Sequence, residues 1–410
     1  MGESTTCCIA GSGPAGAVLG LLLARSGIDV IVLEKHGDFL RDFRGDTIHP
    51  STREVIDELG LGPRFEELPQ RKVERLNVVT DTGEIAFVDL GLLKSRHPYI
   101  TFIPQWDFLT MVTEEAAKYP NFRLLMQAEA FDLVREQGRI AGVRYRDEKG
   151  EEHEIQAALT VVADGRNSTL PRAAGLVRHD YDAPMDVAWF RLDRVQGDRP
   201  DTFLRVGAGH LLVGINRMSY WQFGYLVPKG RFGEVREEGI EEFRRQVADL
   251  VPFLGDRLEE LDFDAVSVLE VRVDRLRRWY RPGLLVIGDA AHAMSPVAGV
   301  GINLAVQDAV AAANRLAGPL RRGVVRTEDL AAVQRRRQPP TIAVQRFQIA
   351  LQNAFIGPTL QGDRPSRPPR ALELARRVRP LRRLMARLLG YGPLPEHVRI
   401  PAAPAAGSRE

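Results

Sequence analysis

The N-terminal stretch alternates between apolar runs and a glycine-rich turn. Residues 5–10 (TTCCIA) form an apolar run that predicts a buried strand. Apolar residues then recur with helical spacing over residues 14–26, before Gly27, and a second apolar run, DVIVLE, ends at Glu34. The order strand, turn, helix, strand predicts the first unit of a parallel α/β sheet.

Two later segments repeat this pattern of an apolar strand followed by a small polar turn. The segment LTVVADGRNSTLPRAAGL (159–176) predicts a strand that ends at Asp164-Gly165, followed by a helix near Leu170. The segment GLLVIGD (283–289) predicts a strand that ends at Gly288-Asp289. A helix is predicted to start at Ile302 and to end at Gly318-Pro319.

The middle of the chain has a different periodicity. Residues 184–273 contain short alternating stretches, which predict antiparallel strands with a helix near 238–250 between them: DVAWFRL, DTFLRV, HLLVGIN, YWQFGYLV and AVSVLEVRV. On YWQFGYLV, Trp221, Phe223 and Tyr225 share one face of the strand. His210 begins the preceding stretch, HLLVGIN.

The C-terminal part is predicted to be helical. TEDLAAVQRRRQPP, from Thr327, predicts a helix stopped by its two prolines, and TIAVQRFQIALQNAFIG predicts another. Residues 362–370 resemble a linker, and two short helices are predicted to meet at Pro380. Their many arginines are interpreted as a solvated surface.

Composition limits the classes of function. The chain has 410 residues with a net charge of +2, 44% hydrophobic and 27% charged residues, as in globular proteins that bind neither nucleic acid nor a membrane surface. No apolar run reaches 18 residues, so we expect no membrane span, and the N-terminus lacks the basic segment of a signal peptide. Cys7 and Cys8 are adjacent in an apolar run, which favours buried thiols and a cytoplasmic protein.

The first turn has the residues of a nucleotide site. GSGPAG places Gly11, Gly13 and Gly16 in the G-x-G-x-x-G spacing, which allows a tight turn, close approach of a pyrophosphate and close packing of helix on strand. Pro14 suits the first turn of a helix, and Glu34 is placed to bind a ribose diol. These features predict an ADP-containing cofactor, and by themselves leave FAD and NAD open.

Taken together, the turn GSGPAG with Glu34, the DG at 164 and the GD at 289 resemble the FAD-dependent group A aromatic hydroxylases, the para-hydroxybenzoate hydroxylase-like flavoprotein monooxygenases. The resemblance extends from about residue 5 to about residue 340. It implies an α/β fold with a Rossmann-type (GR2-like) FAD-binding domain, an interleaved antiparallel-sheet substrate domain and C-terminal helices. The expected division is a discontinuous FAD-binding domain (1–75, 100–180 and 275–360), a substrate-binding sheet domain (76–99 and 181–274), a C-terminal helical segment (361–400) and a disordered tail (401–410).

The resemblance also implies the cofactor site and the reaction. With the turn residues above, the FAD site is assigned to Gly11, Gly13, Pro14, Ala15, Gly16, Glu34, Lys35, Arg44, Gln105, Ala130, Asp164, Gly288, Asp289, Pro296, Gly299, Gly301, Ile302 and Asn303. The implied enzyme takes electrons from NADPH or NADH and uses O2 to oxygenate a small, electron-rich, aromatic substrate through a flavin C4a-hydroperoxide. The candidates for the substrate pocket are His210, Trp221, Phe223 and Pro296, and no catalytic base or oligomeric state is assigned.

Other functions share parts of this pattern. A double-bond reductase similar to geranylgeranyl reductases has the same GD loop, and a non-catalytic nucleotide-binding protein is a third possibility. The W-x-W-x-I-P motif of flavin halogenases is absent from the sequence. Asp289 and His292 resemble a metal pair, but no third ligand lies at suitable spacing nearby, and three neighbours in one loop do not suit a Ser295–His292–Asp289 triad. We therefore predict no metal site and a structural role for His292.

Overall fold

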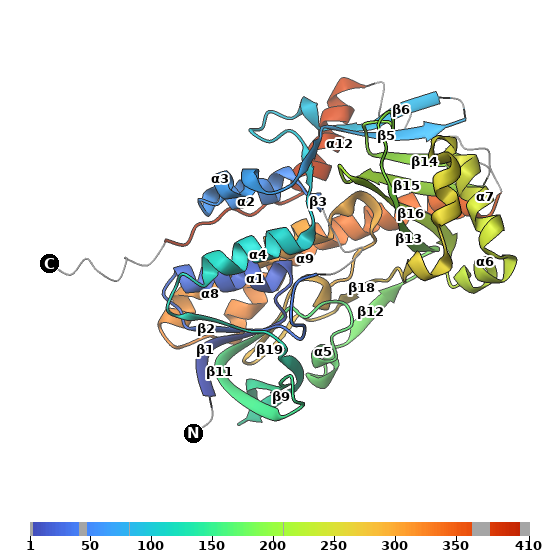
Figure 1. Cartoon of the computed structure of the whole chain (residues 1–410). Helices are drawn as coiled ribbons and strands as arrows, with labels where there is room; N and C mark the ends of the chain where they lie inside the picture. Colours follow the sequence, from blue (N-terminus) through green and yellow to red (C-terminus); the bar gives the residue numbers. More distant parts are fainter. Residues whose placement is uncertain (1–2, 41–46, 82, 208, 363–377, 402–410) are drawn as a thin grey trace.

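A computed structural model describes residues 3–40, 47–81, 83–207, 209–362 and 378–401 (Figure 1). Its largest sheet has the strand order β19-β20-β11-β1-β2-β8, and β9 and β10 extend it through β11. The bounds are β1 (Glu3–Ala10), β2 (Val30–Leu33), β8 (Phe122–Leu125), β9 (Glu129–Glu136), β10 (Arg139–Arg146), β11 (Glu152–Val162), β19 (Tyr280–Arg281) and β20 (Leu284–Val286). Strands β1, β2, β8, β11 and β20 run parallel, so the predicted α/β class is confirmed.

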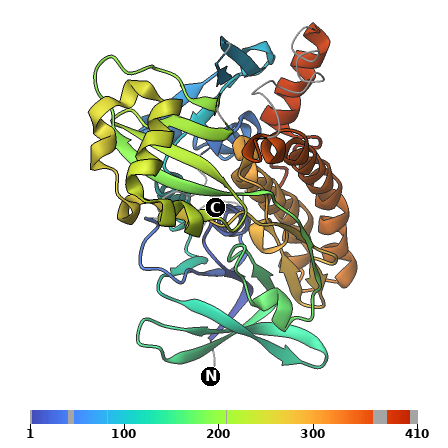
Figure 2. The ribbon, with the colours of Figure 1, turned by 90° about the vertical axis from the view of Figure 1, so that its right-hand side faces the viewer.

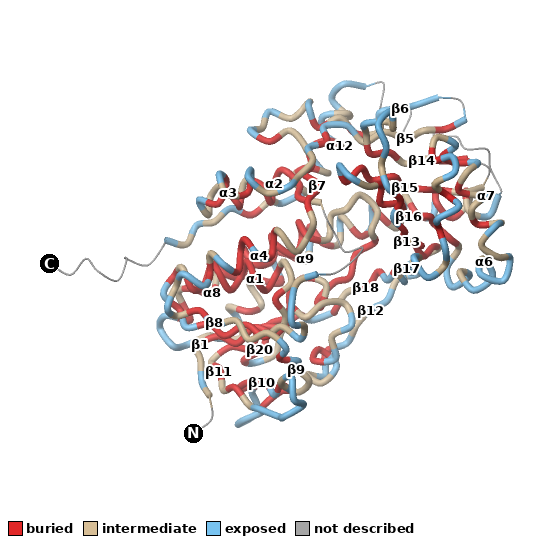
Figure 3. Tube along the Cα trace, in the orientation of Figure 1, coloured by how far each residue is buried: buried red, intermediate tan, exposed pale blue. Residues whose placement is uncertain are grey.

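Helices cover one side of this sheet. They are α1 (Pro14–Arg25), α4 (Gln105–Ala116), α8 (Gly301–Arg321) and α9 (Thr327–Leu351). Helix α1 packs against both α4 and α8, and α8 also packs against α9 (Figure 1). Because α1 is enclosed on several sides, almost all of its residues are buried, as are Cys7 and Cys8 in the strand beneath it (Figure 3).

A second sheet lies beside this first unit, with the order β17-β13-β16-β15-β14-β5-β6 (Figure 2). The bounds are β5 (Arg75–Thr80), β6 (Gly83–Asp89), β13 (Met185–Asp193), β14 (Phe203–Gly207), β15 (His210–Asn216), β16 (Tyr220–Pro228) and β17 (Ser267–Leu269). Helices α6 (Phe232–Glu238) and α7 (Ile240–Leu250) cover its outer face, so the predicted strands and interposed helix are present. Of the stretch AVSVLEVRV, only β17 joins this sheet, whereas Val273 begins β18 and pairs elsewhere.

The remaining elements are shorter or lie outside the two large sheets. They are β3 (Thr47–Ile48), β4 (Arg71–Val73), β7 (Ile100–Phe102), β12 (Arg178–Tyr181), β18 (Val273–Leu276), α2 (Pro50–Glu58), α3 (Gly62–Glu67), α5 (Leu170–Ala173), α10 (Gly357–Leu360), α12 (Arg379–Tyr391), the 3-10 turns η1 (Leu90–Leu92), η2 (Pro252–Glu260), η3 (Phe263–Ala265), η4 (Gly288–Ala290) and η5 (Val297–Gly299), and the π-helical η6 (Gln352–Ile356). Within the described residues, none of the helices combines the length and hydrophobicity needed to cross a bilayer.

Two predicted helix ends are wrong, because prolines do not stop these helices. Helix α8 continues through Pro319 to Arg321, and α9 continues through Pro339 and Pro340 to Leu351. A proline inside a helix removes one N–H donor and its ring crowds the carbonyl four residues earlier, but the buried contacts of α9 on both sides of Pro339-Pro340 hold the helix together. Pro380 lies in the first turn of α12. Most of the predicted linker and of the first short helix falls in residues 363–377, which lie outside the described residues. The same holds for residues 402–410 of the predicted tail.

Candidate functional site

The carboxyl ends of three parallel strands meet at one edge of the large sheet. Ala10 at the end of β1 pairs with Val162 of β11, which in turn pairs with Val286 of β20. The turns that follow these strands contain Gly11, Asp164 and Gly288. Ligands of open α/β sheets bind at this edge.

The three glycines of the first turn have different surroundings. A Cβ on Gly11, which has φ +98°, would lie 2.5 Å from the Cα of Asp164, and a Cβ on Gly16 would lie 1.9 Å from the carbonyl oxygen of Gly11. Both positions therefore require glycine for packing within the protein. A Cβ on Gly13 would meet no atom within 4 Å, so this glycine faces open space at the start of α1, where a pyrophosphate can approach.

The carboxylate of Glu34 is held in the same turn. One of its oxygens accepts a hydrogen bond from the backbone N–H of Ser12 (3.1 Å) and the other accepts from the N–H of His36 (3.1 Å). These bonds fix the carboxylate beside the glycine turn, which suits the predicted contact with a ribose diol. Lys35 is exposed next to it.

Several buried polar atoms around this edge lack a partner within the described part of the chain. They are the Ser12 Oγ, the Asp164 Oδ1 and two guanidinium nitrogens of Arg166, whose third nitrogen donates to Asp289 (3.2 Å). Buried polar groups without partners are costly in a folded protein. Their concentration beside the open face of Gly13 is the arrangement that a polar, phosphate-containing ligand would complete.

Burial raises the pKa of the Asp164 carboxyl from 3.8 to about 6. Because the folded state favours the protonated form, the apoprotein is expected to lose stability as the pH rises from about 4 to about 6, by up to about 3 kcal/mol. In Asp164→Asn this loss is absent. The check is the free energy of urea unfolding of both apoproteins between pH 4 and pH 7, and parallel pH profiles would contradict the expectation.

The turn at Gly288-Asp289 is anchored to α8. Asp308 of that helix accepts hydrogen bonds from the backbone N–H of Gly288 (3.1 Å), from His292 Nε2 (2.6 Å) and from Arg337 Nε (3.0 Å). Burial alone would raise the pKa of Asp308, but His292 and Arg337 outweigh it and lower the pKa. His292 is thus part of a buried ionic group that supports the turn, which agrees with its predicted structural role.

The loop before α8 has strained backbone and a fixed position. Ala298 (φ 67°) and Gly299 (φ 60°) both lie in the left-handed region, which is unusual for alanine. The Thr47 hydroxyl donates to the Gly299 carbonyl (2.6 Å), and a Cβ at Gly299 would lie 2.5 Å from that hydroxyl. A Cβ on Gly301 would meet no atom within 4 Å, so the start of α8 is open.

Asn303 has a role that its position in the motif did not reveal. Its Oδ1 accepts from the His49 N–H (2.9 Å) and from the Thr52 hydroxyl (2.6 Å), and its Nδ2 donates to the Thr47 carbonyl (3.3 Å). The side chain therefore joins the loop to β3 and α2, and only its backbone N–H is available to a ligand at the helix start. His49 and Thr52 lie in the segment HPST (49–52), and no local pattern in the sequence indicates their contact with Asn303.

The remaining predicted cofactor residues are spread around this edge. Gln105 begins α4, shortly after β7, and Ala130 is partly buried in β9 of the large sheet. Pro14 and Ala15 form the first turn of α1, and Pro296 and Ile302 flank the strained loop. Arg44 lies outside the described residues.

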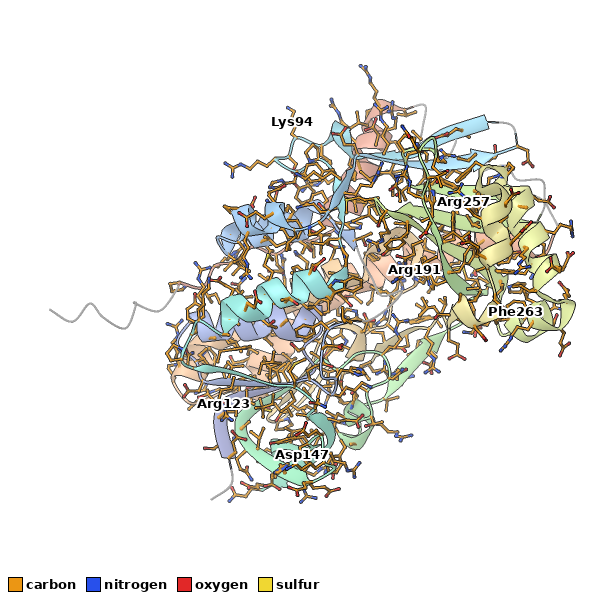
Figure 4. All side chains as sticks on the ribbon, in the orientation of Figure 1. Lys94, Arg123, Asp147, Arg191, Arg257 and Phe263 are labelled. Atoms are coloured by element: carbon orange, nitrogen blue, oxygen red, sulfur yellow. The ribbon has the colours of Figure 1, made fainter. Side chains whose placement is uncertain are left out.

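The second sheet has two different faces. Trp221, Phe223 and Tyr225 are 0–2% exposed and pack with Phe243 of α7 in an aromatic core on the outer face. His210 is also on this side, where it shares a hydrogen bond with the Tyr225 hydroxyl, and burial lowers its pKa. Figure 4 shows Phe263 among the helices at this outer edge, whereas Arg191 of β13 lies toward the centre of the molecule.

The opposite face of this sheet is the one that meets the strained loop. Leu211 and Leu226 pack there with Trp189 and with Val297, the residue after Pro296. The prediction of Trp221, Phe223 and His210 as pocket residues therefore conflicts with their packing under α7, because the helix covers the face that the alternating pattern could not assign. Pro296 remains a candidate.

Comparisons with known proteins agree with this geometry. A family model described as an FAD binding domain matches residues 4–347. The 6-methylpretetramide 4-monooxygenase of Streptomyces rimosus is 32% identical over 95% of this chain and 93% of its own length. The digeranylgeranylglycerophospholipid reductase 2 of Methanopyrus kandleri is 26% identical over 79% of this chain and 78% of its own. Among solved structures, the OxyS anhydrotetracycline hydroxylase of Streptomyces rimosus is similar in fold, with a TM-score of 0.75, 22% identity, and coverage of 95% of this chain and 76% of that chain.

Proposed function

Because this chain belongs to the FAD binding domain family, we propose that it is a single-component FAD-dependent monooxygenase. It takes electrons from NADPH or NADH and uses O2 to hydroxylate a small, electron-rich aromatic compound. The observation that carries the proposal is the similarity, along nearly the full length of both chains, to a protein named 6-methylpretetramide 4-monooxygenase.

The residues at the sheet edge fit FAD. The start of α1 beside Gly13 would receive the pyrophosphate, Glu34 would bind the adenosine ribose, and Asp289 with Arg166 would face the ribityl chain. Bound FAD supplies the redox and oxygen-transfer chemistry. The loop at residues 296–301 would lie beside the ring, where the start of α8 would stabilise negative charge on the reduced ring by about 0.3–2 kcal/mol.

The proposal has a direct test. The purified protein is examined for the visible absorption of bound flavin, and NAD(P)H and O2 consumption are measured with and without 6-methylpretetramide and simpler phenols. Stimulation by an aromatic compound, with one oxygen atom from O2 in the product, is the expected result. A colourless protein that takes up no added FAD would rule the proposal out.

The second candidate function is reduction of a double bond, favoured by the similarity to the Methanopyrus kandleri reductase. The two functions differ in their need for O2. Turnover under anaerobic conditions without a hydroxylated product would favour the reductase. We also propose a cytoplasmic location, since both cysteines are unpaired and buried.

Trp189 and Trp221 lie on opposite faces of the second sheet, so their substitutions test the two faces separately. We expect Trp189→Ala to raise the KM for the aromatic substrate with little loss of stability, because Trp189 is only partly buried on the loop side. Trp221→Ala is expected to cost about 3–5 kcal/mol of stability, because Trp221 is fully buried in the aromatic core. Steady-state kinetics measure KM in both variants, and thermal unfolding measures their stability. A smaller increase in KM in Trp189→Ala than in Trp221→Ala would contradict the prediction.

A further inference from the structure

A row of buried polar side chains lies along one side of α9 and η6. It consists of Gln334, Arg337, Thr341, Gln345, Gln348 and Gln352. The spacing of three and four residues places neighbours in this row on the same side of the helix. Such residues are seldom buried without partners, so the groups that they bind indicate why the row is there.

The last two glutamines bind the segment that leads into the strained loop. Gln348 Nε2 donates to the carbonyl oxygens of Ser295 (3.0 Å) and Val297 (2.8 Å). Gln352 Nε2 donates to the Ser295 hydroxyl (2.7 Å), which itself accepts from the Val297 N–H (3.2 Å). Two side chains thus bind both residues that flank Pro296.

The same end of the helix also contacts the second sheet. The chain is wound as a π-helix over Gln352–Ile356, a rare form that is frequent at functional sites. Phe355 and Ile356 pack with Leu211 and Leu226 on the loop-facing side of the sheet, in the cluster that contains Val297. The polar and apolar side chains of this one segment therefore join the loop to the sheet.

We propose that Gln348 and Gln352 are positioning residues that fix the loop at Pro296 relative to the loop-facing side of the second sheet. That this loop affects the reaction rests on the proposed function. Its attachment to α9 and η6 rests only on the hydrogen bonds of Gln348 and Gln352. In a monooxygenase this attachment would set the distance between flavin and substrate. With a loosened loop, more NAD(P)H and O2 would be converted to NAD(P)+ and H2O2, instead of to hydroxylated product and water.

The test uses Gln348→Met and Gln352→Met, which keep the length of the side chain and remove its N–H donors. The matched control is Gln334→Met on the same helix, where the lost bonds go to the Trp279 N–H and the Arg277 carbonyl instead of to Ser295 or Val297. Amide hydrogen exchange over residues 293–301 of the apoprotein is expected to become about tenfold faster in the two test variants and to stay unchanged in the control. The ratio of H2O2 formed to NAD(P)H consumed is expected to at least double in the test variants alone.

Unchanged exchange in the loop of both test variants would overturn the attachment, and faster exchange with an unchanged peroxide ratio would overturn the positioning role. Should Gln348→Met fail to fold, Ser295→Ala is tested instead. It removes the hydroxyl that accepts the hydrogen bond from Gln352, and it is expected to give the same faster exchange and the same higher peroxide ratio. A wild-type protein that takes up no FAD would end the proposed function, and the exchange experiment would still decide the attachment.

Discussion

Gly13→Val is expected to weaken FAD binding by about 100-fold or more, which corresponds to about 2.7 kcal/mol, while the apoprotein keeps its melting temperature. A Cβ at this position meets no protein atom within 4 Å, so the folded chain tolerates a side chain there. The added methyl groups would occupy the space in which the pyrophosphate approaches the start of α1. Fluorescence titration of the apoprotein with FAD measures the affinity, and thermal unfolding measures the stability.

The matched control is Gly16→Ala, three residues away in the same turn. Its Cβ would lie 1.9 Å from the Gly11 carbonyl oxygen, so we expect a lower melting temperature of the apoprotein itself. The pair separates a glycine needed by the ligand from one needed by the fold. FAD affinity of wild-type strength in Gly13→Val would show that the pyrophosphate does not bind at this turn.

Asp308→Ala is expected to lower the free energy of unfolding by about 3–5 kcal/mol, because it removes the nearer carboxylate of the buried Arg337 guanidinium (3.0 Å) and leaves it only the Glu396 carboxylate at 3.8 Å. The same change removes the acceptor of the Gly288 N–H, so the turn that carries Asp289 loses its link to α8. FAD affinity is therefore expected to fall together with stability. Urea unfolding of the apoprotein and FAD titration check the two effects.

An exposed ion pair gives the control for charge removal. Glu242→Gln breaks the pair with Arg245 on the surface of α7, and is expected to change the free energy of unfolding by less than about 1 kcal/mol. Equal effects in Glu242→Gln and Asp308→Ala would mean that the buried ionic group does not support the turn.

The nucleotide turn could be predicted because its requirements are local. Gly11 needs a left-handed backbone, Gly16 needs space beside the Gly11 carbonyl, and Pro14 needs the first turn of a helix. Each requirement limits the residue type at one position, and the strands on both sides are continuous apolar runs. The position of Glu34 directly after β2 follows from the same short unit.

The faces of the second sheet could not be predicted in the same way. Alternation places Trp221 and Phe223 together, but either face of a strand can be the covered one. The packing of Phe243 from α7, some twenty residues further along the chain, decides that these aromatic rings form core. The continuation of α9 through Pro339 and Pro340 likewise depends on contacts with residues distant in the sequence, such as those of Gln334 and Gln345 with the segment 274–293.

By itself, the sequence determined the α/β class, the glycine turn and the acids that follow three strands, because these depend on short-range backbone geometry and on apolar runs. Only the tertiary structure decided that Asp308 supports Gly288, that Asn303 joins the loop to β3 and α2, and that Gln348 holds Ser295 and Val297. The reason is physical: a buried polar side chain must find its partner in three dimensions, and that partner lies on an element whose place is set by packing.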